Sequence, residues 1–234
     1  MRLHTREWGS GDRYAVLVHG VMSDSRTWRR VGPELARRGY HVVAVDLRGH
    51  GHSAHADEYT AELMAADVVE TVPTRPDLVV GHSLGGLTVS LAVERLDPRR
   101  AVYVDPAFSS PASGWFQRML APAFLRQLAR RSAARIAKVN PKWDPADVAI
   151  EVESFRVFDR AVLPSLVAPG ALRAPDTMAV PSLVVLADRS RLVGPQLADR
   201  LRDDGFEVRV VAGSGHVVNR DDHDGFMRAL DGWI

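Results

Sequence analysis

The chain has 234 residues, a length typical of one large α/β domain. Acidic and basic residues are mixed along it and nearly cancel to a net charge of +1, so we expect neither nucleic acid nor a membrane surface as its partner. It contains no cysteine, which excludes disulfides, thiolate catalysis and cysteine-ligated metals. The charged N-terminal stretch does not resemble a signal peptide, and no apolar run approaches the roughly 20 residues of a membrane span. We therefore expect a cytoplasmic protein.

Short, valine-rich apolar runs recur along the chain. They are nearly continuous rather than alternating, as expected for strands buried on both faces of a parallel sheet. Residues 2–8 add a possible edge strand, closed by a Gly-Ser-Gly turn. The six apolar runs cover residues 14–19, 41–46, 78–81, 101–105, 182–187 and 206–212.

Helical patterns fill most of the gaps between these runs. They cover residues 27–38, 60–72, 84–96, 194–204 and 221–233. Such β–α alternation predicts a doubly wound, mostly parallel sheet of about seven strands with helices on both faces.

One segment breaks the alternation. Residues 107–178 contain no valine-rich strand, but they contain two stretches of helical period and several prolines. We interpret this segment as a helical cap insertion. The core domain then comprises residues 1–106 and 179–234.

A serine between glycines follows the run at 78–81. Gly81-His82-Ser83-Leu84-Gly85 has the Gly-x-Ser-x-Gly pattern of a nucleophile elbow, a tight turn between a strand and a helix. Glycine at 81 and 85 relieves the crowding of that turn. Ser83 is then presented at the carboxyl edge of the sheet, and the N–H of Leu84 lies at a helix N-terminus, where an anion is favoured.

A serine hydroxyl needs a base to accept its proton. If the order is Ser…Asp…His, the base must lie late in the chain, where only His216 and His223 remain. His216 follows the last strand in a glycine-containing loop, whereas His223 has the surroundings of a solvated helix residue. We predict His216 as the base.

Four motifs in this order resemble the α/β-hydrolase superfamily, and specifically its serine esterases and lipases. They are His19-Gly20 after a strand, Asp46-Leu47-Arg48-Gly49-His50-Gly51-His52-Ser53 after the next, the elbow GHSLGG, and the late GSGH. The resemblance implies that the backbone N–H of Val21 joins that of Leu84 in the oxyanion hole. It also implies structural roles for His19 and His82, and for Arg48 and Ser53 as residues that hold neighbouring segments together.

The carboxylate that orients the histidine has two candidates. In most members that this chain resembles, the acid follows the penultimate strand, but the aligned position here is Ser190, and Asp188 lies two residues earlier. Other members carry the acid at the end of the preceding strand, where this chain has Asp105-Pro106. We predict Asp105, with Asp188 as the alternative.

These residues predict an enzyme that cleaves a carboxylic ester of a small, apolar molecule through an acyl-enzyme. Lactone, thioester, amide and carbon–carbon bond hydrolysis and acyl transfer stay open, as does a non-catalytic receptor for a small ligand. We expect the insertion to line the substrate site, and we expect no cofactor. The candidate substrate-binding residues are Trp115, Phe116, Met119, Phe155 and Phe158.

A metal site is not expected. The cluster of His50, His52 and His55 has no carboxylate at a metal-ligand spacing. No feature of the sequence indicates an oligomeric state.

Overall fold

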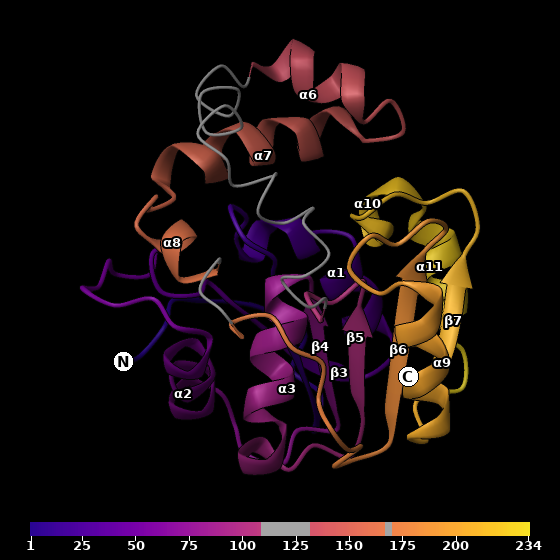
Figure 1. Ribbon diagram of the computed structural model, residues 1–234. Coiled ribbons are helices and arrows are strands. Elements are labelled where there is room, and N and C mark those ends of the chain that lie inside the picture. Colours follow the sequence, from indigo (N-terminus) through magenta and orange to yellow (C-terminus); the bar gives the residue numbers. More distant parts are fainter. Residues whose placement is uncertain (109–131, 167–169) are drawn as a thin grey trace.

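The computed structural model describes residues 1–108, 132–166 and 170–234. Seven strands form one sheet in the order β1-β3-β2-β4-β5-β6-β7, in which β1 alone runs antiparallel to its neighbour (Figure 1). This arrangement confirms the predicted fold class. The strands are β1 Thr5–Trp8, β2 Arg13–Val18, β3 Tyr40–Val45, β4 Leu78–His82, β5 Ala101–Val104, β6 Ser182–Ala187 and β7 Glu207–Val211.

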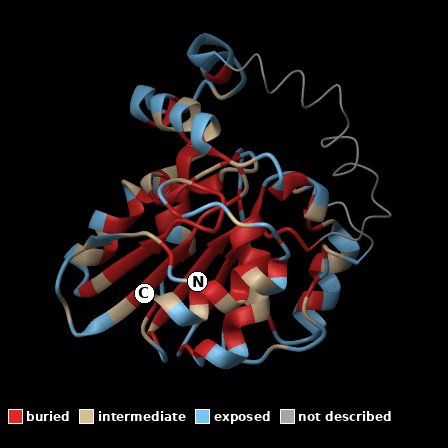
Figure 2. Cartoon of the chain, turned by 90° about the vertical axis from the view of Figure 1, so that its left-hand side faces the viewer, coloured by how far each residue is buried: buried red, intermediate tan, exposed pale blue. Residues whose placement is uncertain are grey.

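The central strands are apolar on both faces because helices cover both sides of the sheet. Every residue of β4, β5 and β6 is buried. One face packs against α2 (Ala61–Thr71), α3 (Leu84–Leu96) and α9 (Pro195–Asp203). The other packs against α1 (Val31–Arg37), α10 (Val218–Asp221) and α11 (His223–Ala229). Figure 2 shows the buried residues concentrated in this sandwich.

Two predicted helices, 27–38 and 221–233, have different bounds in the structure. The stretch predicted at 27–38 begins as a short 3₁₀ helix, η1 (Ser25–Trp28), and continues as α1. The side chain of Asp24 causes the early start, because it accepts a hydrogen bond from the N–H of Arg26. At the C-terminus, the carboxylate of Asp222 accepts from the N–H of Gly225 and so separates α10 from α11.

Three described helices lie between β5 and β6, within the predicted insertion. They are α6 (Ala133–Val139), α7 (Pro145–Val157) and α8 (Val162–Leu166). Asp144 starts α7 by accepting from the N–H of Ala146, with Pro145 in the first turn. In Figure 1, α6 and α7 lie above the carboxyl ends of the strands. Among the described residues, no helix combines the length and apolarity needed to cross a bilayer.

Candidate active site

Ser83 lies in the sharp turn between β4 and α3. Its backbone has φ 52° and ψ −115°, a conformation that a non-glycine residue adopts only under strain. The surrounding hydrogen bonds hold it there. Its N–H donates to Val104 O at 3.0 Å, and its carbonyl accepts from Leu87 N at 3.2 Å and Ala107 N at 3.0 Å.

The glycines of the elbow allow backbone segments to approach closely. A Cβ at position 81 would lie 2.3 Å from Gly85 O, and one at position 85 would lie 2.3 Å from Val18 O. Both neighbours are backbone atoms, which cannot rotate out of the way. The Gly-x-Ser-x-Gly spacing therefore follows from the packing of α3 against β2 and β4.

His216 bridges Ser83 and Asp105. It lies in the loop between β7 and α10, with Nε2 3.1 Å from Ser83 Oγ and Nδ1 2.6 Å from Asp105 Oδ2. The three side chains come from the ends of β4, β5 and β7, which meet at one edge of the sheet. Ser83 is buried, whereas the His216 side chain is 38% exposed, so the imidazole is the part of this group that faces solvent.

Asp105 is held as a buried carboxylate. Burial by itself would raise its pKa, but the hydrogen bond and charge of His216, with smaller contributions from the Ser190 hydroxyl and the N–H of Ala187, bring the pKa below its ordinary value. Ser190 Oγ also accepts from Leu192 N at 3.3 Å and Val193 N at 3.0 Å. The sequence indicates Ser190 only as a position that lacks the expected acid, and its contribution to the pKa of Asp105 becomes evident only in the fold.

Three other histidines near the site are buried and act as neutral hydrogen-bonding groups. Burial lowers the pKa of His19, and lowers those of His50 and His82 to about 3. His19 Nε2 accepts from Leu47 N at 3.0 Å, while its Nδ1 lies 2.7 Å from Gly20 O. His82 Nε2 lies 2.9 Å from His216 O. These contacts organise the loops on either side of Ser83.

The loop after β2 packs directly against Ser83. A Cβ at Gly20 would lie 3.2 Å from Ser83 Cβ, so the backbone at Gly20 and Val21 runs alongside the serine. No described residue accepts a hydrogen bond from the N–H of Val21 or of Leu84. Leu84 is the first residue of α3, whose early N–H groups have no partner within the helix.

A buried hydrogen bond and a part-buried ion pair connect α7 to the segment that follows β2. Asp24 accepts from three nitrogens of Arg26, and its Oδ2 also accepts from Ser154 Oγ of α7 at 2.6 Å. The pKa of Asp24 falls to about 2, because these hydrogen bonds outweigh the opposing effect of burial. Asp147 of α7 binds Arg29 through two hydrogen bonds of 2.8 and 3.0 Å.

Arg220, on α10, forms a second connection between α7 and the core. Its side chain is almost fully buried, pairs with Glu151 of α7 at 2.9 Å and lies 3.4 Å from Ser23 Oγ. It also lies over the ring of Trp143. Sequence reasoning missed this residue. Its position four residues after His216, just beyond a predicted catalytic loop, is the signal in the sequence that could have indicated it.

The remaining predicted residues fall in different places. Asp188 is exposed, and its backbone N–H donates to Ser214 O at 3.1 Å. His223 begins α11, and its Nδ1 has no hydrogen-bond partner among the described residues. Phe158 is buried against the His50 ring at 4.8 Å, and the Phe155 ring lies 5.7 Å from Arg160 Cζ. The candidates Trp115, Phe116 and Met119 lie outside the described residues.

The loop after β3 holds neighbouring segments together. Arg48 forms two hydrogen bonds with Asp67 of α2, at 2.6 and 2.8 Å, and Ser53 Oγ donates to Asp46 O at 2.6 Å. The histidines of this loop face different partners. His50 Nδ1 contacts Arg48 O, the His52 ring lies 4.9 Å from the His4 ring, and His55 Nδ1 lies 3.4 Å from Asp159.

The strand order, the strained elbow at the carboxyl edge and the chain order Ser83, Asp105, His216 define a class of protein. The chain belongs to the alpha/beta hydrolase family, whose profile matches residues 15–229. This membership confirms the resemblance derived from the motifs.

Individual relatives are similar over different lengths. "Probable esterase PIR7A" of Oryza sativa subsp. indica is 34% identical over 125 residues, which are 50% of this chain and 47% of that protein. The chain thus spans about half the length of the curated relatives it matches. Among solved structures, E-2-(acetamidomethylene)succinate hydrolase has a TM-score of 0.78 and 25% identity, covering 98% of this chain and 94% of that one. Est816, described as an N-acyl homoserine lactone degrading enzyme, has a TM-score of 0.75 and 23% identity, covering 99% and 96%, and shows the shared fold.

Proposed function

We propose that the protein is a serine hydrolase that cleaves a carboxylic ester of a small, apolar molecule. The observation that carries this proposal is the placement of His216 within hydrogen-bonding distance of both Ser83 and Asp105. The similarity to a rice esterase supports the choice of substrate bond.

In this proposal Ser83 Oγ attacks the ester carbonyl carbon while His216 Nε2 removes the hydroxyl proton. Asp105, bonded to Nδ1, fixes the tautomer that leaves Nε2 free to accept, and it stabilises the imidazolium that forms. The negative charge that develops on the carbonyl oxygen is bound by the N–H groups of Val21 and Leu84.

Collapse of the tetrahedral intermediate breaks the bond between the carbonyl carbon and the alcohol oxygen, which takes the proton from His216 Nε2. Water then attacks the acyl-enzyme, with the same imidazole as base, and releases the acid and free Ser83. Each turnover consumes one ester and one water and returns every group to its starting protonation state. No cofactor takes part.

We assign substrate selection to the insertion at residues 107–178. Its described helix α7 lies above the carboxyl edge and is attached beside both catalytic loops, through Ser154 to Asp24 and through Glu151 to Arg220. Aromatic residues of the insertion, including Phe155 and Phe158, are the candidates for contact with an apolar acyl or alcohol group.

A second candidate is hydrolysis of an acyl amide. It is favoured by the similarity along nearly the whole chain to a hydrolase of E-2-(acetamidomethylene)succinate. The same serine, base and oxyanion donors serve both reactions. The protonated imidazole matters more for an amide, because an amine is a poorer leaving group than an alcohol.

The test is turnover of a short-chain p-nitrophenyl ester, together with labelling by a fluorophosphonate probe. We expect both in the wild-type protein and neither in Ser83→Ala. Tight binding of esters without turnover would instead support a ligand receptor, and transfer of the acyl group to an added alcohol would support an acyltransferase. An acyl-chain-length series and a matched amide then separate the two hydrolytic candidates.

A further inference from the structure

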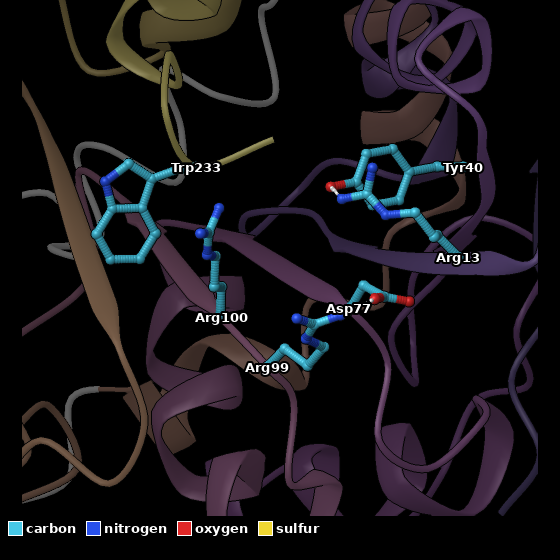
Figure 3. A pocket seen from close by; sticks show the side chains of 6 residues that line it. All are labelled: Arg13, Tyr40, Asp77, Arg99, Arg100 and Trp233. Atoms are coloured by element: carbon cyan, nitrogen blue, oxygen red, sulfur yellow. Dashed lines mark hydrogen bonds and ion pairs between the residues drawn. The ribbon is translucent and has the colours of Figure 1, made fainter.

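A cavity lies at the edge of the sheet opposite the candidate active site. It has a volume of about 290 Å³, and we call it the amino-edge cleft. Figure 3 shows its lining side chains, which are Arg13, Tyr40, Asp77, Arg99, Arg100 and Trp233.

The topology brings these residues together. Arg13 and Tyr40 are the first residues of β2 and β3, Asp77 directly precedes β4, and Arg99 and Arg100 directly precede β5. Because parallel strands begin at the same edge, their first residues gather there. Ser83 and Asp105 lie at the other ends of β4 and β5, so the proposed esterase chemistry does not use this cleft.

The lining carries an excess of positive charge. Three guanidinium groups face one carboxylate, that of Asp77. Asp77 is already engaged, because its Oδ1 accepts from Arg99 Nη1 at 3.4 Å and its Oδ2 accepts from Tyr14 N at 3.1 Å. Two positive charges are therefore left without a neutralising acid in the cleft.

The two remaining arginines are held in place by groups that carry no charge. Arg13 donates to the hydroxyl of Tyr40 and lies over its ring. Arg100 donates to Gly232 O at 2.9 Å, with its Cζ 5.8 Å from the Trp233 ring centre. Neither arginine forms an ion pair with a carboxylate in residues 1–108, 132–166 and 170–234.

Their spacing suits a ligand with more than one negative group. Arg13 begins β2 and Arg100 directly precedes β5, the two strands that flank β4. Two strand separations and an offset of two residues along the strands place their backbones about 12 Å apart. In Figure 3, Arg100 lies between the Trp233 ring and the Arg13–Tyr40 pair. Each guanidinium keeps unused N–H donors, which bind phosphate oxygens in pairs.

We propose that the amino-edge cleft binds a small polyanion of the diphosphate class. The excess of two positive charges matches an anion with at least two negative charges. The volume lies at the lower limit for small-molecule sites, which favours a phosphate chain over a larger ligand. Tyr40 and Trp233 add a hydroxyl donor and an aromatic wall.

Calorimetric titration with inorganic pyrophosphate, in a phosphate-free buffer of low ionic strength, tests the proposal. We expect one-to-one binding that weakens about tenfold in Arg100→Gln and is lost in the Arg13→Gln/Arg100→Gln double variant. Binding should also weaken as salt is raised, because the arginines are exposed. The matched control is Arg135→Gln on α6, an exposed arginine with no ion pair among the described residues, which should bind like wild type.

A parallel titration with ADP identifies the source of the phosphate chain. Tighter binding than pyrophosphate indicates a nucleotide whose base contacts an aromatic wall, and equal binding indicates the phosphate chain alone. Far-UV circular dichroism and a melting curve verify folding. If the double variant fails to fold, Arg100→Gln still decides, because it leaves the Arg13–Tyr40 contact intact. No binding at millimolar pyrophosphate, or equal affinity in wild type and Arg100→Gln, would overturn the proposal.

Discussion

Replacing Asp105 by asparagine tests the orientation of His216 most directly. The substitution keeps the shape of the side chain and removes its charge. Asp105 Oδ2 lies 2.6 Å from His216 Nδ1, and unit charges about 4 Å apart attract by about 4 kcal/mol at an effective dielectric constant of 20. That loss alone slows acylation by about 10³-fold. An asparagine that donates to Nδ1 also favours the wrong tautomer, which brings the expected loss to about 10⁴-fold.

The assay is the pre-steady-state release of p-nitrophenol, which reports acylation of Ser83 separately from deacylation. Asp188→Asn is the matched control, because it makes the same chemical change at the exposed alternative acid. We expect Asp188→Asn to acylate at nearly the wild-type rate. If it abolishes acylation while Asp105→Asn does not, the assignment of the acid is wrong.

A second variant extends the test to the position next to the carboxylate. The Ser190 hydroxyl contributes to the low pKa of Asp105, so this side chain lies close to the carboxylate that contacts His216. A carboxylate introduced at position 190 would therefore lie near the imidazole. We expect Ser190→Asp to restore part of the acylation rate in the Asp105→Asn background. Ser190→Asn in that background is the uncharged control, and equal rates for the two would contradict the reasoning.

Three further predictions concern stability. His50 is buried with a pKa of about 3, so the unfolded state binds more protons than the folded state between pH 3 and 6.5. The free energy of unfolding should therefore fall by about 2 kcal/mol from pH 7 to pH 5 through this residue. Denaturant titrations of His50→Gln should show a smaller fall over the same pH range. A Cβ at Gly85 meets backbone at 2.3 Å, so Gly85→Ala should cost about 2–3 kcal/mol of unfolding free energy, whereas Gly194→Ala, with open space around it, should be neutral. Ser154→Ala removes a hydrogen bond to buried Asp24, whose lowered pKa stabilises the fold above about pH 4 and ceases to do so near pH 2. We expect this variant to lose about 1–2 kcal/mol of unfolding free energy at pH 7, and the loss should shrink on acidification. A loss that does not depend on pH would refute this assignment.

Six strands were predictable from the sequence because a doubly covered sheet demands continuous apolar runs. The edge strand β1 is polar and was indicated only by the turn that follows it, and all seven strands appear near the expected positions. The elbow was predictable for a related reason. The close backbone contacts at positions 81 and 85 exclude any side chain, so the turn requires glycine at both positions and can be recognised from the sequence.

The carboxylate that contacts His216 could not be identified from the sequence in this way. Asp105 and Asp188 both follow strands that end at the same edge, and only the fold reveals that Asp105 is buried against His216 while Asp188 is exposed. The contacts between α7 and the loop after β2 could not be predicted for a similar reason. Asp24 and Ser154 are 130 residues apart, and neither lies in a motif that indicates a partner.

Two neighbouring residues of the elbow hold the same histidine. Ser83 contacts the imidazole of His216 through its side chain, and His82 contacts the carbonyl of His216 through its ring. The separation between Ser83 and His216 is thus set mainly within a few bonds of the turn itself. The insertion supports the flanks of the His216 loop, where Lys142 Nζ donates to Gly213 O at 2.8 Å and Trp143 Nε1 donates to Asp221 at 2.8 Å. Exchange of the insertion for one from another member of the family, with Lys142, Trp143 and Glu151 retained, should therefore alter which molecules are accepted while leaving Ser83 and His216 in register.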